Sequence, residues 1–399
     1  MDICFITPRF PFPTTKGDKL RAYHEIRRLS SRHSITLVAG ADEALSDDAL
    51  AEVRQYCKRM EVVRVGGSSS VVSALAKGAT TQLPLQALFY DTSEFRRAVR
   101  DVLANAQFDV IHASTIRVAP QVWGVERTPV VIDLVDTVSR GLAIRRDTLS
   151  PLLRPAYDFE RRRLVEYERA ACRHFPRLIV CAERDREALA SDNVVVLRTC
   201  ADTAQFRFVR EGRASDVVIM TGNMGYQPNV DAAVWFVRNV WPEVRTVHPG
   251  ARFQIVGARP AAAVRELGAE AGVEVVGPVP EIAPFLELAT LAVSPTRGGS
   301  GMQTKVVEAL ATGTPLVATS FANEGIGATP ERQLLIADEP GDFARAVISL
   351  LEQPALRDSL ADEGHAFGTR EFSWDSHVER LEGIYREAID LKKGPPAAT

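Results

Sequence analysis

Short runs of β-branched and aliphatic residues alternate with segments of helical periodicity along nearly all of the 399 residues. Such runs are typical of parallel strands that are buried on both faces, and the helical segments supply the crossovers that these strands require. The expected strands form two series, at residues 3–7, 35–38, 62–65, 110–112, 130–134 and 178–180, and at residues 217–221, 253–257, 273–277, 291–294, 316–318 and 334–337. The alternation predicts an α/β fold with two doubly wound parallel sheets.

A polar stretch at residues 210–215 separates the two series and follows neither the strand nor the helix period. A fresh apolar run begins directly after it, and a chain of this length corresponds to two domains at about 150 residues each. We therefore expect a Rossmann-like N-terminal domain over residues 1–210 and a Rossmann-like C-terminal domain over residues 211–371.

Charge and cysteine content argue against several classes of protein. The formal net charge is −3, and residues 1–200 carry 30 basic and 25 acidic side chains, an excess too small for a nucleic-acid-binding surface. That basic half is compatible with an anionic acceptor or a membrane surface. Five unclustered cysteines predict neither a disulfide framework nor a zinc site. Without a signal peptide or a long apolar run, we expect a cytoplasmic protein, at most peripheral to the inner face of the membrane.

One long helix is expected over residues 151–175. It contains six arginines, which we interpret as a solvated helix face.

The stretch most informative about chemistry follows the expected strand at residues 291–294. A glycine-rich loop comes next, and a helix begins by about Gln303. Backbone N–H groups at a helix N-terminus attract phosphate groups, and Arg297 and Lys305 add full positive charges at the same end. Ligands of open α/β sheets bind at the carboxyl ends of the strands, so we expect an anionic ligand here.

Residues 308–315, with the sequence EALATGTP, match the Glu-Ala-x-Ala-x-Gly-x-Pro motif of the retaining glycosyltransferases of family four, and the chain resembles that family over nearly its whole length. The resemblance implies a GT-B fold with a deep interdomain cleft, completed by a helix at about residues 372–392 that returns to the first domain. It implies a nucleotide diphosphate sugar, UDP- or GDP-linked, as co-substrate, without a resident cofactor or a metal. Glu308 would accept hydrogen bonds from the ribose hydroxyls.

The same resemblance assigns roles to further residues. Three are implied to be catalytic, namely His112, Arg297 and Lys305. Donor contacts are implied at Gly17, Gly222, Asn223, Arg259, Gly277, Val279, Gly298, Gly299, Ser300, Gly301, Met302 and Glu308. Acceptor contacts are implied at Lys16, Asp18 and Arg21. Two departures from the family pattern stand out, because Ser300 replaces a frequent second glutamate and Asn223 stands where a cation is frequent. Arg297 and Lys305 would then neutralise the diphosphate.

The expected activity is transfer of a sugar, with retention of anomeric configuration, to a carbohydrate, lipid-linked or natural-product acceptor. Ser300, and residues 199–202 in place of the family's Asn-Gly-Val-Asp, leave a non-catalytic nucleotide-sugar-binding protein as an alternative. A Gly299-x-Gly301 pattern before a helix also suggests an NAD-dependent oxidoreductase. That pattern is weak, because Thr304 replaces the third glycine and the loop follows the fourth strand of its domain rather than the first.

Overall fold

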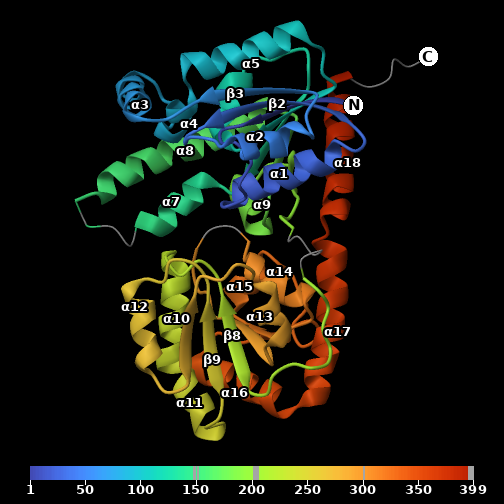
Figure 1. Cartoon of the computed structure of the whole chain (residues 1–399). Coiled ribbons are helices and arrows are strands. Elements are labelled where there is room, and N and C mark those ends of the chain that lie inside the picture. The colour runs from blue at the N-terminus through green and yellow to red at the C-terminus, as the bar shows by residue number, and fades with distance from the viewer. Residues whose placement is uncertain (147–149, 151, 201–205, 300–301, 394–399) are drawn as a thin grey trace. The chain divides into compact units, whose positions relative to one another are not determined.

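The structure, a computed structural model, describes residues 1–146, 150, 152–200, 206–299 and 302–393 (Figure 1). The chain divides into two compact units, which we call unit 1 (Met1–Arg198 with His377–Thr399) and unit 2 (Thr199–Ser376). Each unit is built on one parallel sheet with helices on both faces, as the alternating pattern predicts. No helix among the described residues combines the length and the apolar character needed to cross a membrane.

Unit 1 contains a seven-stranded parallel sheet with the order β3-β2-β1-β4-β5-β6-β7. Its strands are β1 (Asp2–Thr7), β2 (Ser34–Ala41), β3 (Arg59–Arg64), β4 (Val110–Ser114), β5 (Val130–Val135), β6 (Arg177–Val180) and β7 (Val194–Val196). Its helical elements are α1 (Gly17–Leu29), α2 (Asp47–Arg54), α3 (Ser68–Thr80), α4 (Leu85–Tyr90), α5 (Ser93–Asn105), η1 (Ile116–Val118), α6 (Ala119–Val122), α7 (Val138–Arg146), α8 (Arg154–His174) and α9 (Glu183–Leu189). The central strand β1 places Ile3 between Ile35 and Val110, so three apolar residues form one buried row.

Unit 2 contains a six-stranded parallel sheet with the order β10-β9-β8-β11-β12-β13. Its strands are β8 (Val217–Thr221), β9 (Arg252–Val256), β10 (Val273–Gly277), β11 (Leu291–Ser294), β12 (Leu316–Ala318) and β13 (Leu335–Ile336). Its helical elements are α10 (Gln227–Asn239), α11 (Trp241–Val247), α12 (Ala262–Glu266), η3 (Leu267–Ala269), α13 (Ala283–Leu288), α14 (Thr304–Ala311), α15 (Ser320–Glu324), α16 (Pro340–Glu352) and α17 (Pro354–Glu371). The strand order reverses between β8 and β11, which makes their carboxyl ends the switch point of the sheet.

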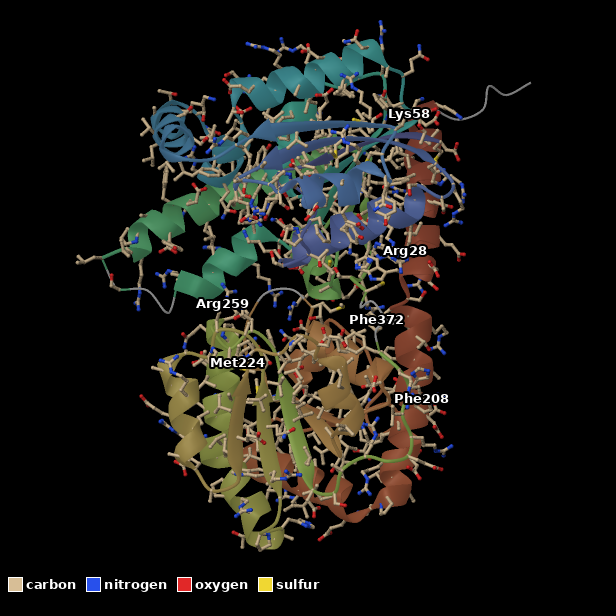
Figure 2. All side chains as sticks on the ribbon, viewed as in Figure 1. Arg28, Lys58, Phe208, Met224, Arg259 and Phe372 are labelled. Carbon is tan, nitrogen blue, oxygen red and sulfur yellow. The ribbon has the colours of Figure 1, made fainter. Side chains whose placement is uncertain are left out.

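The first residues of unit 2 are fastened to its helices. Phe208, labelled in Figure 2, packs against the ring of His365 with 4.3 Å between ring centroids. A Cβ on Gly313 would lie 2.4 Å from the Phe208 ring, and the φ of Gly313 is +67°, so both space and backbone require glycine there. Arg213 donates to the carbonyl oxygens of Leu286 and Thr312 at 2.8 and 2.9 Å. The polar stretch at residues 210–215 is therefore tied to the ends of α13 and α14.

The last helix, α18 (Trp374–Lys393), packs into unit 1 from His377 onward. Its apolar residues recur at helical spacing, and they join Ile3 and Phe5 of β1 in one buried cluster. The residues that α18 contributes to this cluster are Val378, Leu381, Ile384, Tyr385 and Ala388. The amphipathic pattern predicted for this segment is thus explained by a buried seam against the sheet of unit 1.

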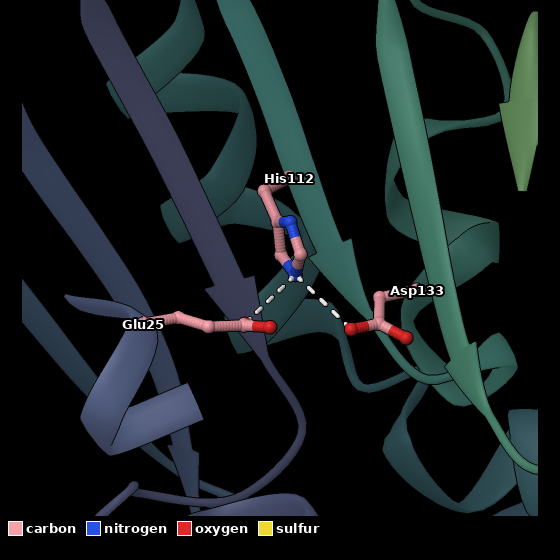
Figure 3. A group of neighbouring side chains, drawn as sticks. All are labelled: Glu25, His112 and Asp133. Atoms are coloured by element: carbon pink, nitrogen blue, oxygen red, sulfur yellow. Dashed lines mark ion pairs between the residues drawn. The ribbon is translucent and has the colours of Figure 1, made fainter. Parts of the chain in front are cut away.

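A buried polar network also joins α18 to the sheet. The Arg21 guanidinium on α1 lies 2.5 Å from Asp133 on β5 and 3.2 Å from Glu25, and all three side chains are almost fully buried. His377 contacts Glu25 at 2.8 Å, and Tyr385 hydrogen-bonds Nδ1 of His112 at 2.9 Å. Figure 3 shows Glu25 and Asp133 on either side of the His112 ring.

The protonation states in this network follow from burial. Burial raises the pKa of Glu25 to about 7, although Arg21 and His112 oppose the shift. Burial lowers the pKa of His112 and brings that of His377 to about 3, so both imidazoles are neutral at pH 7. Arg21 is then the cation that compensates the carboxylate of Asp133.

Replacing Arg21 tests this account of the network. Arg21→Met leaves the Asp133 carboxylate buried without its cation, which typically costs about 3–5 kcal/mol. We expect a corresponding fall in the urea midpoint for unfolding of unit 1 in the full chain. Arg100→Met on α5, where the side chain is exposed, should change stability by less than about 0.5 kcal/mol. Equal midpoints for the two variants would show that the network does not depend on Arg21.

Candidate functional site

The switch point of unit 2 is the site at which a parallel sheet of this order binds ligands. β8 and β11 are hydrogen-bonded neighbours, so the loops that follow them leave the same edge of the sheet side by side. The first loop runs from Gly222 to Tyr226 and leads into α10, and the second follows Ser294 and leads into α14. Both loops contain residues for which the sequence analysis predicts contacts with the nucleotide-sugar donor.

The loop after β8 is held tightly against the end of β9. A Cβ on Gly257 would lie 1.7 Å from the carbonyl oxygen of Gly222, so only glycine permits this approach. Met224 is fully buried, and its N–H donates to Ala258 O at 2.8 Å. The Asn223 side chain accepts from Gly225 N at 3.1 Å. These contacts give the turn one fixed shape.

Residues predicted to contact the sugar donor also lie at the ends of the neighbouring strands. Arg259 is exposed and has a φ of +54°, and Figure 2 shows it above the carboxyl ends of the strands of unit 2. Gly277 is buried and has a φ of +79°, and its carbonyl oxygen accepts from Gly257 N at 2.8 Å. Val279 is partly exposed two residues later. These residues therefore lie along the same sheet edge as the β8 loop.

Lys305 connects the two loops at the switch point. It lies in the first turn of α14, is 9% exposed, and donates from Nζ to Oδ1 of Asn229 on α10. A second, longer contact of 3.4 Å reaches Oγ1 of Thr296 in the β11 loop. Burial lowers the Lys305 pKa to about 8, and nearby Glu308 opposes the shift. The ammonium is therefore charged at pH 7 and held by neutral oxygens.

Glu308 lies three residues after Lys305 on α14 and is partly exposed. Burial raises its pKa to about 7, and Lys305 acts in the opposite direction. A carboxyl group and an amine whose pKa values both approach neutrality thus lie one turn apart at the switch point. Perturbed pKa values of this kind are typical of binding and catalytic sites.

Two further residues of the β11 loop, Arg297 and Gly299, lie against α10. Arg297 is exposed, and its guanidinium carbon lies 4.8 Å from the centroid of the Trp235 ring, a cation–π distance. Gly299 has a φ of +133°, and a Cβ there would lie 3.5 Å from Pro228. Gly298 and Met302 are partly exposed, whereas Ser300 and Gly301 lie outside the described residues.

Sequence reasoning assigned no role to two polar residues at this site. Asn229 and Thr296 accept from Lys305, and Thr296 lies within the glycine-rich segment that pointed to the site. Asn229 also donates from Nδ2 to Asn223 O at 3.0 Å, so it fixes the β8 loop as well. The only sequence signal for Asn229 was its position in the first turn of a helix directly after a glycine-containing turn.

The assigned residues of unit 1 fall into two groups. Lys16 and Gly17 are exposed at the start of α1, and Asp18 forms an ion pair of 2.8 Å with Arg9. The side chains of Arg21 and His112 are only 1% and 0% exposed, and they hydrogen-bond within the network of unit 1. These internal bonds are the physical reason why both side chains point into the core of unit 1.

The same network contains a group whose geometry resembles a metal site. Glu25, His112 and Asp133 each offer one ligand atom, and these atoms lie within 4.8 Å of one another. The Arg21 guanidinium already contacts both carboxylates, and a cation bound between them would meet its positive charge. The residues therefore fit an internal ion pair better than a metal.

Comparison with known proteins finds a family match within unit 2. Residues 215–353, most of unit 2, match the family model described as glycosyl transferases group 1. A D-inositol 3-phosphate glycosyltransferase of Catenulispora acidiphila is 33% identical over 134 residues, which cover 33% of this chain and 31% of that protein. The chain thus spans about a third of the length of this curated relative.

Solved structures extend the likeness of fold to the whole chain. The Anabaena protein HepE, crystallised with UDP, has a TM-score of 0.64 at 15% identity, covering 97% of this chain and 100% of that one. Sucrose-phosphate synthase from Thermosynechococcus elongatus has a TM-score of 0.70 at 15% identity, covering 97% and 99%. The chain therefore has a GT-B fold, and residues 215–353 of unit 2 match the glycosyl transferases group 1.

Proposed function

We propose that the chain transfers a sugar from a nucleotide diphosphate sugar to a hydroxyl acceptor, with retention of anomeric configuration. The observation that carries this proposal is the position of Lys305 and Glu308 one turn apart on α14, at the switch point of unit 2 and within the segment that matches the family. Structural neighbours whose crystals contain UDP or UDP-glucose support a uridine nucleotide as the first donor to test.

Each part of the donor meets complementary chemistry in this arrangement. Lys305 and Arg297 present positive charge near the N-terminus of α14, where a diphosphate is stabilised. Glu308 offers a carboxylate to the two ribose hydroxyls. The fixed turn at Gly222 and Asn223 would form the neighbouring wall, without a side chain at Gly222.

Catalysis in this proposal is positional and electrostatic. We nominate no nucleophile, because retention follows when the acceptor attacks from the face that the diphosphate leaves and the departing phosphate oxygen takes the acceptor proton. The chain's own contribution is to hold the donor in place and to stabilise the negative charge that develops on the leaving group. Lys305 and Arg297 are the cations available for that role at this sheet edge.

The acceptor belongs to the proposal as well. A glycan, a lipid-linked glycan or a small-molecule glycoside each carries the required hydroxyl. In unit 1, the exposed Lys16 and the partly exposed Asp18 near the start of α1 are the candidates for contacting it. A lipid-linked acceptor would bring the chain to a membrane surface.

The direct test incubates the full chain with UDP-glucose or GDP-mannose and a panel of glycoside acceptors. We expect release of nucleoside diphosphate that depends on the acceptor, and a product whose anomeric proton coupling by NMR matches that of the donor. An inverted product would refute retention. Tight nucleotide binding without any product across the panel would favour a nucleotide-sugar-binding protein instead.

The pKa values of Lys305 and Glu308 predict a pH optimum for nucleotide binding. Diphosphate binding favours charged Lys305, so affinity should fall as pH rises through about 8, the Lys305 pKa. Ribose binding favours ionised Glu308, so affinity should also fall as pH drops through about 7. Calorimetry should give the tightest binding between these values.

Two substitutions test which residue causes the loss of affinity on each side of this pH optimum. Lys305→Arg stays charged and should flatten the alkaline side, whereas Glu308→Gln should flatten the acidic side relative to the natural protein. Comparing variants at each pH cancels the titration of the nucleotide's own phosphate, whose second pKa is about 6. A profile unaffected by both substitutions would remove these residues from the site.

A further inference from the structure

A groove of about 710 Å³ is formed in unit 1 by α5, by α6 with the residues that follow it, and by α8. α5 lies over β3 in Figure 1. It contributes Arg96, Arg100 and Leu103 to the groove, and α8 contributes Tyr167. The volume is within the range of pockets that bind small molecules. We call this space the α5–α8 groove.

The α5–α8 groove is separate from the acceptor region proposed for unit 1. Leu103 lies in the last turn of α5, before β4 begins, and Trp123 precedes β5. Segments that lead into parallel strands lie near the amino ends of those strands. Lys16 and Asp18 instead follow β1 and lie at the start of α1. The Leu103 and Trp123 end of the groove therefore lies toward the opposite edge of the sheet.

Aromatic packing fixes one wall of the groove. The Trp123 ring stacks on Tyr167 with 5.3 Å between ring centroids and on His174 with 4.8 Å. Tyr167 and His174 are seven residues apart on α8, which corresponds to a rise of about 10.5 Å, so the indole is held between their rings. His174 Nε2 also donates to Trp123 O at 2.6 Å. The position of Tyr167 in the wall is thus set by packing on α8.

Two buried side chains that line the groove have a polar atom without a hydrogen-bond partner among the described residues. The first atom is the hydroxyl oxygen of Tyr167, whose side chain is 7% exposed. The second is Oε1 of Gln121, which is 9% exposed. Buried polar groups usually have partners, and a ligand that supplies them removes the cost of the unmade bonds.

The chemistry of these two atoms indicates what the ligand must offer. Gln121 Nε2 donates to Tyr90 O at 3.2 Å and lies 3.5 Å from Oδ1 of Asp91. Both neighbours are acceptors, so the orientation of the amide is fixed and Oε1 requires a donor. Burial raises the pKa of Tyr167, so its hydroxyl stays protonated at pH 7 and can donate or accept. Hydroxyl groups on a ligand satisfy both atoms.

The groove also has an excess of positive charge. Asp91 is the one acidic residue among the described residues that line it, and Arg96 donates to both of its carboxylate oxygens. Lys77 Nζ lies 3.7 Å from Oδ2 of the same carboxylate. Arg100, one turn after Arg96, is exposed and forms no ion pair within the part of the chain that the structure describes. Its guanidinium is therefore available to an anionic group.

We propose that the α5–α8 groove binds a saccharide that carries a negative charge, either a uronate residue of a glycan or a free sugar phosphate. Its hydroxyl groups bond Gln121 Oε1 and the Tyr167 hydroxyl, and its anionic group pairs with Arg100. The partly exposed Leu103 and Pro120 offer apolar surface to the C–H groups of a sugar ring. An inorganic anion would satisfy Arg100 but would leave this apolar surface uncovered. The proposal concerns unit 1 and does not depend on the nucleotide site of unit 2.

Calorimetric titration of the full chain with three probes tests the ligand class. The probes are trigalacturonate, glucose 6-phosphate and the neutral maltotriose. We expect at least one acidic probe to bind, and maltotriose to bind at least about tenfold more weakly, because it lacks the group that pairs with Arg100. Trigalacturonate alone would identify a glycan segment as the ligand, and glucose 6-phosphate alone a soluble sugar phosphate. Failure of both, equal binding of maltotriose, or equally tight binding of inorganic phosphate would overturn the proposal.

Two substitutions with matched controls locate the binding. Tyr167→Phe removes a hydroxyl without a partner, so it should leave the unfolding temperature unchanged and weaken the acidic probe about three- to tenfold. Arg100→Gln should weaken it about tenfold or more. The controls are Tyr157→Phe on α8 and Arg97→Gln on α5, which do not line the groove. All four variants should bind nucleoside diphosphate as the natural protein does. If the two groove variants bind the acidic probe as tightly as their controls, the groove is not the saccharide site.

Discussion

The buried ammonium of Lys305 constrains the whole switch point of unit 2. A charge at 9% exposure is costly unless oxygen atoms surround it, and here those atoms come from Asn229 on α10 and Thr296 in the β11 loop. Asn229 in turn fixes the β8 turn through Asn223, whose position depends on the close approach of Gly222 and Gly257. One side chain therefore couples the two loops that the proposed diphosphate would meet.

Unit 1 depends on a polar network of a different kind. Its members come from α1, two strands and α18, and they are fully buried with their charges compensated internally. Arg21 and His112 hold helices and strands together there, whereas Lys305 and Glu308 lie at a sheet edge with pKa values near neutrality. Burial alone therefore does not distinguish a structural network from a candidate binding site. The position of the residues at a sheet edge has to be considered as well.

Sequence reasoning succeeds where the interactions are local along the chain and fails where the partners are far apart in sequence. Apolar runs predicted β8, β10, β11 and β12 with their observed bounds, because buried parallel strands leave a local signal. β7 was missed because three valines are too short a run to show a period. The burial of Arg21 was not predicted, because its partner Asp133 is 112 residues away, and the burial of His112 depends on Tyr385 at the other end of the chain. Asn229 was missed for the same reason, since it meets Lys305 only in the folded unit.

The central claim, that unit 2 binds a nucleotide over α14 with its ribose on Glu308, is tested most directly by a two-way comparison. The dissociation constants of UDP, or of whichever nucleoside diphosphate binds most tightly, and of its 2′-deoxy counterpart are measured for the natural protein and for Glu308→Gln. Hydrogen bonds to a charged group contribute about 1.5–3 kcal/mol, so the substitution should weaken the ribonucleotide by roughly ten- to a hundredfold. The deoxynucleotide should already bind poorly and lose little more. Equal losses for both nucleotides would contradict the account, because the carboxylate would then not contact the ribose.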